Sequence, residues 1–171
     1  MTSILKVDSI QTAAGKPILN STGSILQIKS AVSTAASSIS GTSFVDIPSM
    51  TATITPSASS SKILIQVSFG ALGCESTGHG CLMKLFRDST QIGNGTGADS
   101  HNVFLNIYQG ATNIFDSVQH MFVDSPSSTS ALVYKMQWAT TGTGQTWYMN
   151  RRGIDNYARM SSTFLLTEIA G

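Results

Sequence analysis

The stretch VDIPSMTATITPSASSSKILIQVSFG, residues 45–70, predicts two neighbouring β-strands on either side of a serine-rich bend. Before the bend, apolar side chains alternate with polar ones, although Pro48 and Ser49 shift the phase and Pro56 ends the run. After the bend, one face is apolar and consists of Ile63, Ile65, Val67 and Phe69. This period of two is typical of half-buried antiparallel strands.

The same pattern continues to the end of the chain. Further runs include NVFLNIY at 102–108, ALVYKMQW at 131–138 and STFLLTEI at 162–169. In total there are about eight such runs, separated by turns rich in Gly, Ser and Asn, and no helical period interrupts them. Residues 44–171 are therefore expected to form one all-β head domain, a sandwich or a barrel.

The first 43 residues have a different character. Residues 1–30 hold short apolar runs that are too small to form a core alone, because isolated pairs of strands are marginally stable in water. We expect residues 1–30 to be an extended anchoring arm and 31–43 to be a linker into the head. The side chains expected to dock the arm on another subunit or protein are Leu5, Val7, Ile10, Ile18 and Leu19.

Charge is scarce in this chain. Charged residues make up 11% of the sequence, against about 25% in an average soluble domain, and the net charge is +1. A polar but uncharged surface suits a particle component or an oligomer. Because there is no basic run, nucleic acid is not an expected partner. No apolar run is long enough to span a bilayer, so membrane insertion is not expected either.

Catalytic motifs are missing from the sequence. There is no GxSxG elbow, and the glycine-rich stretch at 93–97 lacks the Lys-Ser/Thr of a phosphate loop. Cys74 and Cys81 flank His79, which leaves a disulfide open and offers only a weak set of metal ligands. We expect no enzyme activity, no cofactor and no metal.

The segment NRRGIDNYARM, residues 150–160, is the strongest candidate for binding. Arginine, tyrosine and asparagine combine flat contact area with directed hydrogen bonds, and loops on a rigid β-scaffold commonly carry such contacts. The alternative is a solvated loop whose arginines pair with Asp155 or with a neighbouring subunit. Two weaker candidates are the tips at 75–80 and 93–102. The expected contact residues are Arg151, Arg152, Asp155, Asn156, Tyr157 and Arg159.

Several stretches together resemble tail-fibre and virion structural proteins of tailed phages, especially marine ones. They are ILKVDSIQTAAGKPIL (4–19), FVDIPSMTATITPSASSSKILIQVSFG (44–70), KLFRDSTQIG (84–93), FVDSPSSTSALVYKMQW (122–138) and STFLLTEIAG (162–171). The resemblance implies an arm that joins a fibre to the particle. It also implies a compact antiparallel jelly-roll-like sandwich, similar to the trimeric heads of the tumour necrosis factor and complement type.

The function expected from this resemblance is structural. The chain would be a homotrimeric tail fibre or fibre tip in the virion, joined to other virion proteins through residues 1–30. Its head loops would contact a host surface glycan or an outer-membrane protein. One alternative is a capsid decoration or head-fibre protein of the same fold. A third, from another class, is a small glycosidase or esterase domain acting on host polysaccharide.

Overall fold

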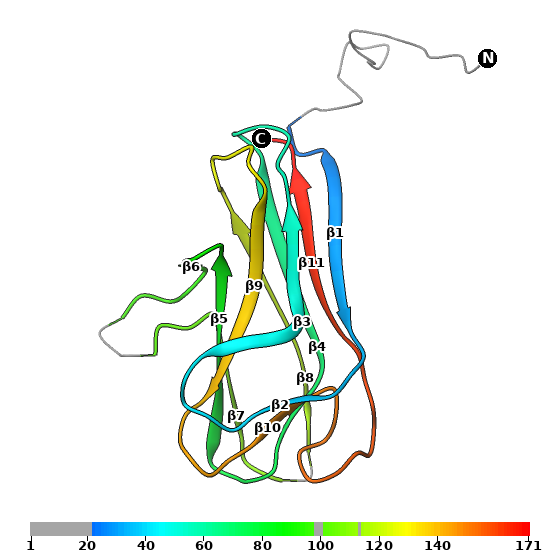
Figure 1. The fold of residues 1–171 in the computed structure, drawn as a ribbon, viewed down its shortest axis with the longest axis vertical. Helices are drawn as coiled ribbons and strands as arrows, with labels where there is room; N and C mark the ends of the chain where they lie inside the picture. The colour runs from blue at the N-terminus through cyan, green and yellow to red at the C-terminus, as the bar shows by residue number, and fades with distance from the viewer. Residues whose placement is uncertain (1–21, 98–100, 113) are drawn as a thin grey trace, which may run out of the picture.

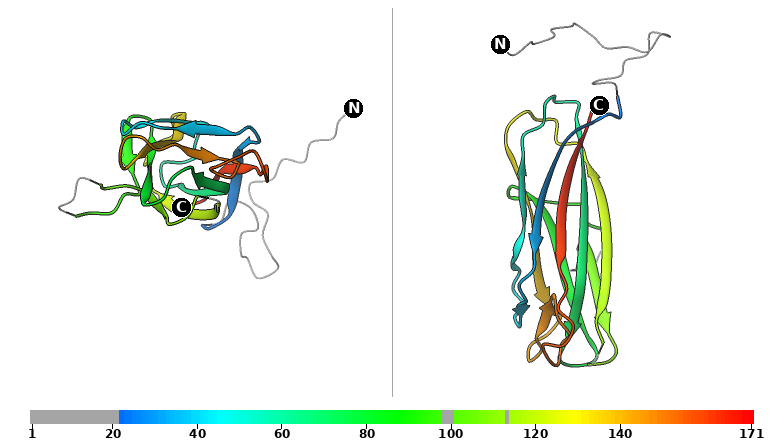
Figure 2. Two further views of the ribbon diagram at one scale, coloured as in Figure 1. Left: turned by 90° about the horizontal axis from the view of Figure 1, so that it is seen from below. Right: turned by 90° about the vertical axis from the view of Figure 1, so that its right-hand side faces the viewer.

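The computed structural model describes residues 22–97, 101–112 and 114–171, and within them the chain forms two antiparallel β-sheets packed face to face (Figures 1 and 2). The first, called the β4 sheet, contains β1 (Ile25–Ser33), β2 (Ser37–Ile39), β4 (Lys62–Cys74), β8 (Asp116–Asp124), β10 (Trp147–Met149) and β11 (Ser162–Ile169). The second, called the β9 sheet, contains β3 (Val45–Ile54), β5 (His79–Arg87), β6 (Thr90–Ile92), β7 (Leu105–Gln109) and β9 (Leu132–Thr140). No helix that could cross a membrane occurs in the described part.

The strand order is that of a jelly-roll-like sandwich. In the β4 sheet, β4 lies between β11 and β8, and β1 pairs with β11 at the edge. Beyond Ser68, β10 takes the place of β11 beside β4, and β2 pairs with β10. In the other sheet, β9 lies between β3 and β5. The chain passes from one sheet to the other between β3, β4 and β5, so the predicted antiparallel sandwich is confirmed.

Alternation along the strands produces the core. The apolar faces predicted for β4 and β9 point into the space between the sheets, where Ile63, Ile65, Tyr134 and Met136 are fully buried. The predicted change of phase near Pro48 is also present. The register of β3 against β9 shifts between Asp46 and Thr51, and Ser49 lies there in the left-handed region with φ of 61°. A β-bulge of this kind restores the inward direction of the apolar residues that follow.

The domain starts earlier than the sequence indicated. Residues 25–30 were assigned to the arm and 31–33 to the linker, but together they form β1, which is paired with β11 along its length. β2 likewise falls inside the expected linker. The boundary at residue 44 is therefore wrong, because the first two strands belong to the β4 sheet. The arm-docking residues Leu5, Val7, Ile10, Ile18 and Leu19 lie outside the described residues.

The described chain begins and ends at the same end of the sandwich (Figure 1). The backbone N–H of Gly23 donates to the carbonyl oxygen of Ala170 at 2.7 Å, and the N–H of Ala170 donates to the carbonyl of Ser24 at 2.8 Å. These two bonds hold the segment before β1 against the segment after β11. We call this the terminal end, and the other end the distal end.

A buried carboxylate holds the terminal end together. Glu168 is fully buried and accepts hydrogen bonds from Gln27 Nε2 (2.6 Å), from the backbone N–H of Ser57 (2.6 Å) and from Ser61 Oγ (2.7 Å). It therefore connects β1, the serine-rich bend and β11. Burial raises the pKa of the Glu168 carboxyl, but these hydrogen bonds outweigh burial and hold the pKa below its ordinary value.

This carboxylate predicts a specific loss of stability in acid. A carboxyl whose pKa is lowered by folding stabilises the folded state above its unfolded-state pKa, here 4.5, and loses that contribution as the pH falls below it. We expect Glu168→Gln to remove this component of the pH dependence, measured by urea unfolding on both sides of pH 4.5. Glu75→Gln, at an exposed glutamate, is the control. An unchanged acid profile in Glu168→Gln would contradict the assignment.

Candidate functional site

The predicted binding segment forms the long connection from β10 to β11 at the distal end (Figures 1 and 2). We call residues 150–161 the distal loop. All six predicted contact residues lie in it, so the structure brings them together as expected. The tip predicted at 75–80, whose last two residues begin β5, lies beside the distal loop's base, because the Tyr148 hydroxyl donates to Glu75 Oε2 at 3.2 Å. The tip at 93–102 belongs to a different connection, from β6 to β7, whose residues 98–100 are not described.

Asn150 fixes the start of the distal loop. It is fully buried and left-handed, with φ of 65°, a conformation that asparagine tolerates better than most residues. Its Nδ2 donates to the carbonyls of Ser33 (2.8 Å) and Ala35 (2.9 Å), and its Oδ1 accepts from Ser162 Oγ (2.6 Å). One side chain thus ties the loop to the β1–β2 connection and to the first residue of β11.

The loop also packs closely on the end of β4. A Cβ added at Gly153 would collide with the backbone carbonyl of Cys74, and a Cβ at Gly73 would meet the backbone N of Gly153 at 2.6 Å. Only glycine at both positions lets the two backbones approach this closely. The loop is therefore seated on the sheet rather than held away from it.

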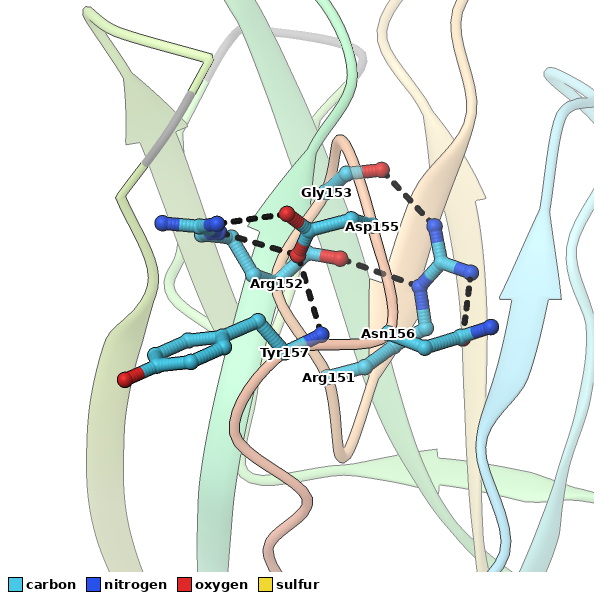
Figure 3. A network of polar contacts seen from close by, with 6 residues as sticks. All are labelled: Arg151, Arg152, Gly153, Asp155, Asn156 and Tyr157. Atoms are coloured by element: carbon cyan, nitrogen blue, oxygen red, sulfur yellow. Dashed lines mark hydrogen bonds and ion pairs between the residues drawn. The ribbon is translucent and has the colours of Figure 1, made fainter.

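Arg151 holds the loop in shape from within. Its guanidinium lies 3.7 Å from the centroid of the Tyr148 ring, a cation–π contact. It donates to the carbonyls of Arg152 (2.9 Å) and Gly153 (2.8 Å) and to Asn156 Oδ1 (3.0 Å), as Figure 3 shows. Three donors directed at the loop's own acceptors make Arg151 a structural cross-link.

Arg152 and Asp155 form the second cross-link. The guanidinium donates to both carboxylate oxygens, with distances of 3.0 and 2.5 Å (Figure 3). The hydrogen bond from Arg152, followed by that from the backbone N–H of Tyr157, lowers the pKa of Asp155. The hydrogen bond to the Asp155 carboxylate in turn raises the pKa of Arg152. One alternative left open by the sequence was that an arginine pairs with Asp155, and Arg152 does so.

Arg151, Arg152 and Asp155 therefore form their polar contacts within the loop, and other side chains of the loop are exposed to solvent. Tyr157 is 71% exposed, and the Arg152 guanidinium lies 5.1 Å from the centroid of its ring. Ile154 is 49% exposed, but it was not among the predicted contact residues. Its apolar side chain within a polar loop is the feature of the sequence that could have identified it. Arg159 is exposed and donates to Asn156 Oδ1 at 3.0 Å.

The two cysteines do not add a second site. Cys74 and Cys81 are both unpaired and buried. Burial, and then the neighbouring Cys74, raise the pKa of the Cys81 thiol far above its usual range. Across the described residues, no three His, Cys, Asp or Glu side chains are grouped so that they could hold a metal ion.

Comparison with models of protein families and with curated proteins finds no match for this sequence.

Proposed function

We propose that this chain is a virion structural protein of a tailed phage, a homotrimeric tail fibre or fibre tip. In this proposal, the N-terminal residues attach the chain to other virion proteins, and the distal loop contacts the host surface. Two observations support it: the resemblance of five stretches of the sequence to such proteins, and the two-ended layout of the domain. The layout carries most of the argument.

The two ends of the sandwich suit two different roles. The described chain starts at the terminal end, where Gly23 is hydrogen-bonded to Ala170, so the residues before it join the domain at that end. The distal loop lies at the other end (Figure 1). The 13 residues of β4 connect the two ends, which corresponds to a separation of about 43 Å at 3.3 Å per residue. A head attached at its terminal end would hold the distal loop away from the particle.

The distal loop has the properties of a preorganised contact surface. Its arginines are already fixed by Asp155, Asn156 and Tyr148, so binding would order few additional side chains. The exposed ring of Tyr157 and the side chain of Ile154 supply apolar contact area. A stacked tyrosine suits a sugar ring or a flat patch on an outer-membrane protein. Three such loops in one trimer would add avidity to a weak single contact.

Replacing Tyr157 should weaken attachment without unfolding the domain. Purified protein should compete with intact particles for the host surface and so block their adsorption. We expect Tyr157→Ala to raise the concentration needed for this block by about tenfold or more, as for a central aromatic contact. Arg152→Ala should act in the same direction, because it releases Tyr157 and Asp155. Thermal unfolding should change little in Tyr157→Ala, because Tyr157 is 71% exposed, and only locally in Arg152→Ala, because Arg152 pairs with Asp155 three residues away in the same loop.

Val133→Ala is the control. Val133 is 39% exposed on the outer face of the β9 sheet, where it pairs with Thr53 toward the terminal end, away from the distal loop. Its removal should leave competition unchanged. If Tyr157→Ala and Arg152→Ala both compete as well as the unaltered protein, the distal loop is not the contact surface.

A further inference from the structure

The outer faces of the two sheets differ sharply in charge. The solvent face of the β9 sheet carries Lys84, Lys135 and Asp46, and the last two form an ion pair at 3.0 Å. Such a face is stable in water. The outer face of the β4 sheet has a different composition.

The register of the strands defines that second face. Residues paired across antiparallel strands point to the same side of a sheet. Three successive rows across β1, β11, β4 and β8 point outward, and they are Ile28–Thr167–Leu64–Val123, Ser30–Leu165–Gln66–Met121 and Val32–Thr163–Ser68–Gln119. None of these side chains is charged, and the next row toward the terminal end adds Ile25, Ile169 and Lys62. We call this surface the β4 face.

The β4 face carries most of the exposed apolar side chains of the described strands. Met121 is 63% exposed, Ile28 55%, Val32 57% and Val123 49%. A groove of about 200 Å³ crosses its centre, lined among others by Gln66, Ser68, Met121 and Leu165. A solvated outer face of an antiparallel sheet normally alternates to polar and charged residues. Six of the twelve side chains in the three rows are apolar and none is charged, and Lys62 enters only with the row at the terminal end, as expected for a surface that is covered.

We propose that the β4 face is where copies of this chain meet, and this rests on the trimer in the proposed function. The four strands, about 4.8 Å apart, and the seven residues from 163 to 169, at about 3.3 Å each, give a flat area of about 440 Å². The true surface area is larger, because side chains project from the sheet. The face thus supplies more than half of the about 800 Å² that each partner contributes to a standard interface.

A second copy of the chain fits the chemistry of this face. An uncharged face needs an uncharged partner, because a charged one would lose its hydration without gaining an ion pair. With only 11% charged residues, this chain offers such a partner in its own β4 face. The charges of the β9 sheet would remain in water. In the trimer of the proposed function, the three β4 faces converge on the three-fold axis, where each face meets parts of the faces of both neighbours in a closed ring.

The test is the mass of the full chain in solution, measured by light scattering after size-exclusion chromatography. The unaltered protein should have three times the 18.1 kDa of one chain. Val123→Glu and Met121→Glu should each reduce the mass to that of a single chain, because each buries a carboxylate near the axis. Val133→Glu is the matched control, since Val133 is a half-exposed valine on the outer face of the β9 sheet and should leave the mass unchanged.

Methionine oxidation gives a readout that needs no variant. Met121 should oxidise more slowly at high protein concentration than after dilution, while Met136, which is fully buried in the core, should be protected equally at both concentrations. A single-chain mass for the unaltered protein would overturn the proposal, as would trimers that persist in both glutamate variants. Equal oxidation of Met121 at both concentrations would also overturn it. A trimeric protein that is missing from particles would instead refute the virion role and leave this interface standing.

Discussion

Replacing Asp124 with alanine is expected to lower the free energy of unfolding by about 3 kcal/mol, one of the two largest effects of a single substitution that we predict. Asp124 ends β8 in the β4 sheet, and its partners Arg87 and Tyr134 belong to the β9 sheet. Arg87 Nη1 donates to both carboxylate oxygens, at 2.9 and 2.7 Å. The Tyr134 hydroxyl donates to Oδ2 at 2.7 Å. The carboxylate therefore bonds the two sheets to each other.

The cost arises from the partners that Asp124→Ala leaves behind. The side chain of Arg87 is only 24% exposed, and Tyr134 is fully buried. Burial, together with the hydrogen bond to Asp124, raises the pKa of Tyr134 well above its usual range, so the hydroxyl stays protonated and must keep an acceptor. Without Asp124, a guanidinium and a hydroxyl remain at the sandwich edge without their acceptor.

Chemical denaturation at neutral pH measures this effect, and Asp46→Ala is the control. Asp46 also forms an ion pair, with Lys135, but its side chain is 58% exposed. An exposed pair contributes about 0.5 kcal/mol or less, so Asp46→Ala should barely change stability. Equal losses in the two variants would show that the Asp124 network does not connect the sheets as described.

Substitution of Asn150 should have an effect of about the same size. We expect Asn150→Ala to lower the free energy of unfolding by about 3 kcal/mol, because several buried groups lose their hydrogen bonds and alanine is strained at positive φ. The carbonyls of Ser33 and Ala35 and the hydroxyl of Ser162 would lose their partner. The distal loop should also loosen, so trypsin should cleave after Arg151 and Arg152 faster than in the unaltered protein.

Asn150→Gly separates the two causes. Glycine adopts a φ of 65° without strain but lacks the amide, so this variant should be less destabilised than Asn150→Ala by about 1 kcal/mol. If glycine restored full stability, the buried hydrogen bonds would contribute nothing, contrary to the geometry at this position.

The sequence predicted the central strands well because a period of two is a local signal. β4 and β9 are clear because one face of each is buried and the other is polar. β1 was missed for the opposite reason. Its outward residues Ile28 and Val32 are apolar, and its inward Ala31 is small, so the two faces do not contrast. The apolar character that hid β1 is the same feature that indicates the β4 face.

The candidate site was only half predictable. Composition was enough to group Arg151, Arg152 and Tyr157 in one loop. Which of them pair internally depends on the path of the backbone, which is set by the left-handed Asn150 and by the close approach of Gly153 to Cys74. Neither constraint has a pattern of its own in the sequence. The exposure of Ile154 and Tyr157 follows from that path.

Antibody labelling of intact tailed particles from the chain's source, viewed by electron microscopy, shows directly whether this chain is a tail component. We expect label at the tail, with the distal loop directed away from the particle. Label over the head would instead assign the chain to capsid decoration and make its N-terminal segment a clamp on the shell. Particles that carry no label, with an antibody that binds the same protein after the particles are dissociated, would contradict the virion role altogether.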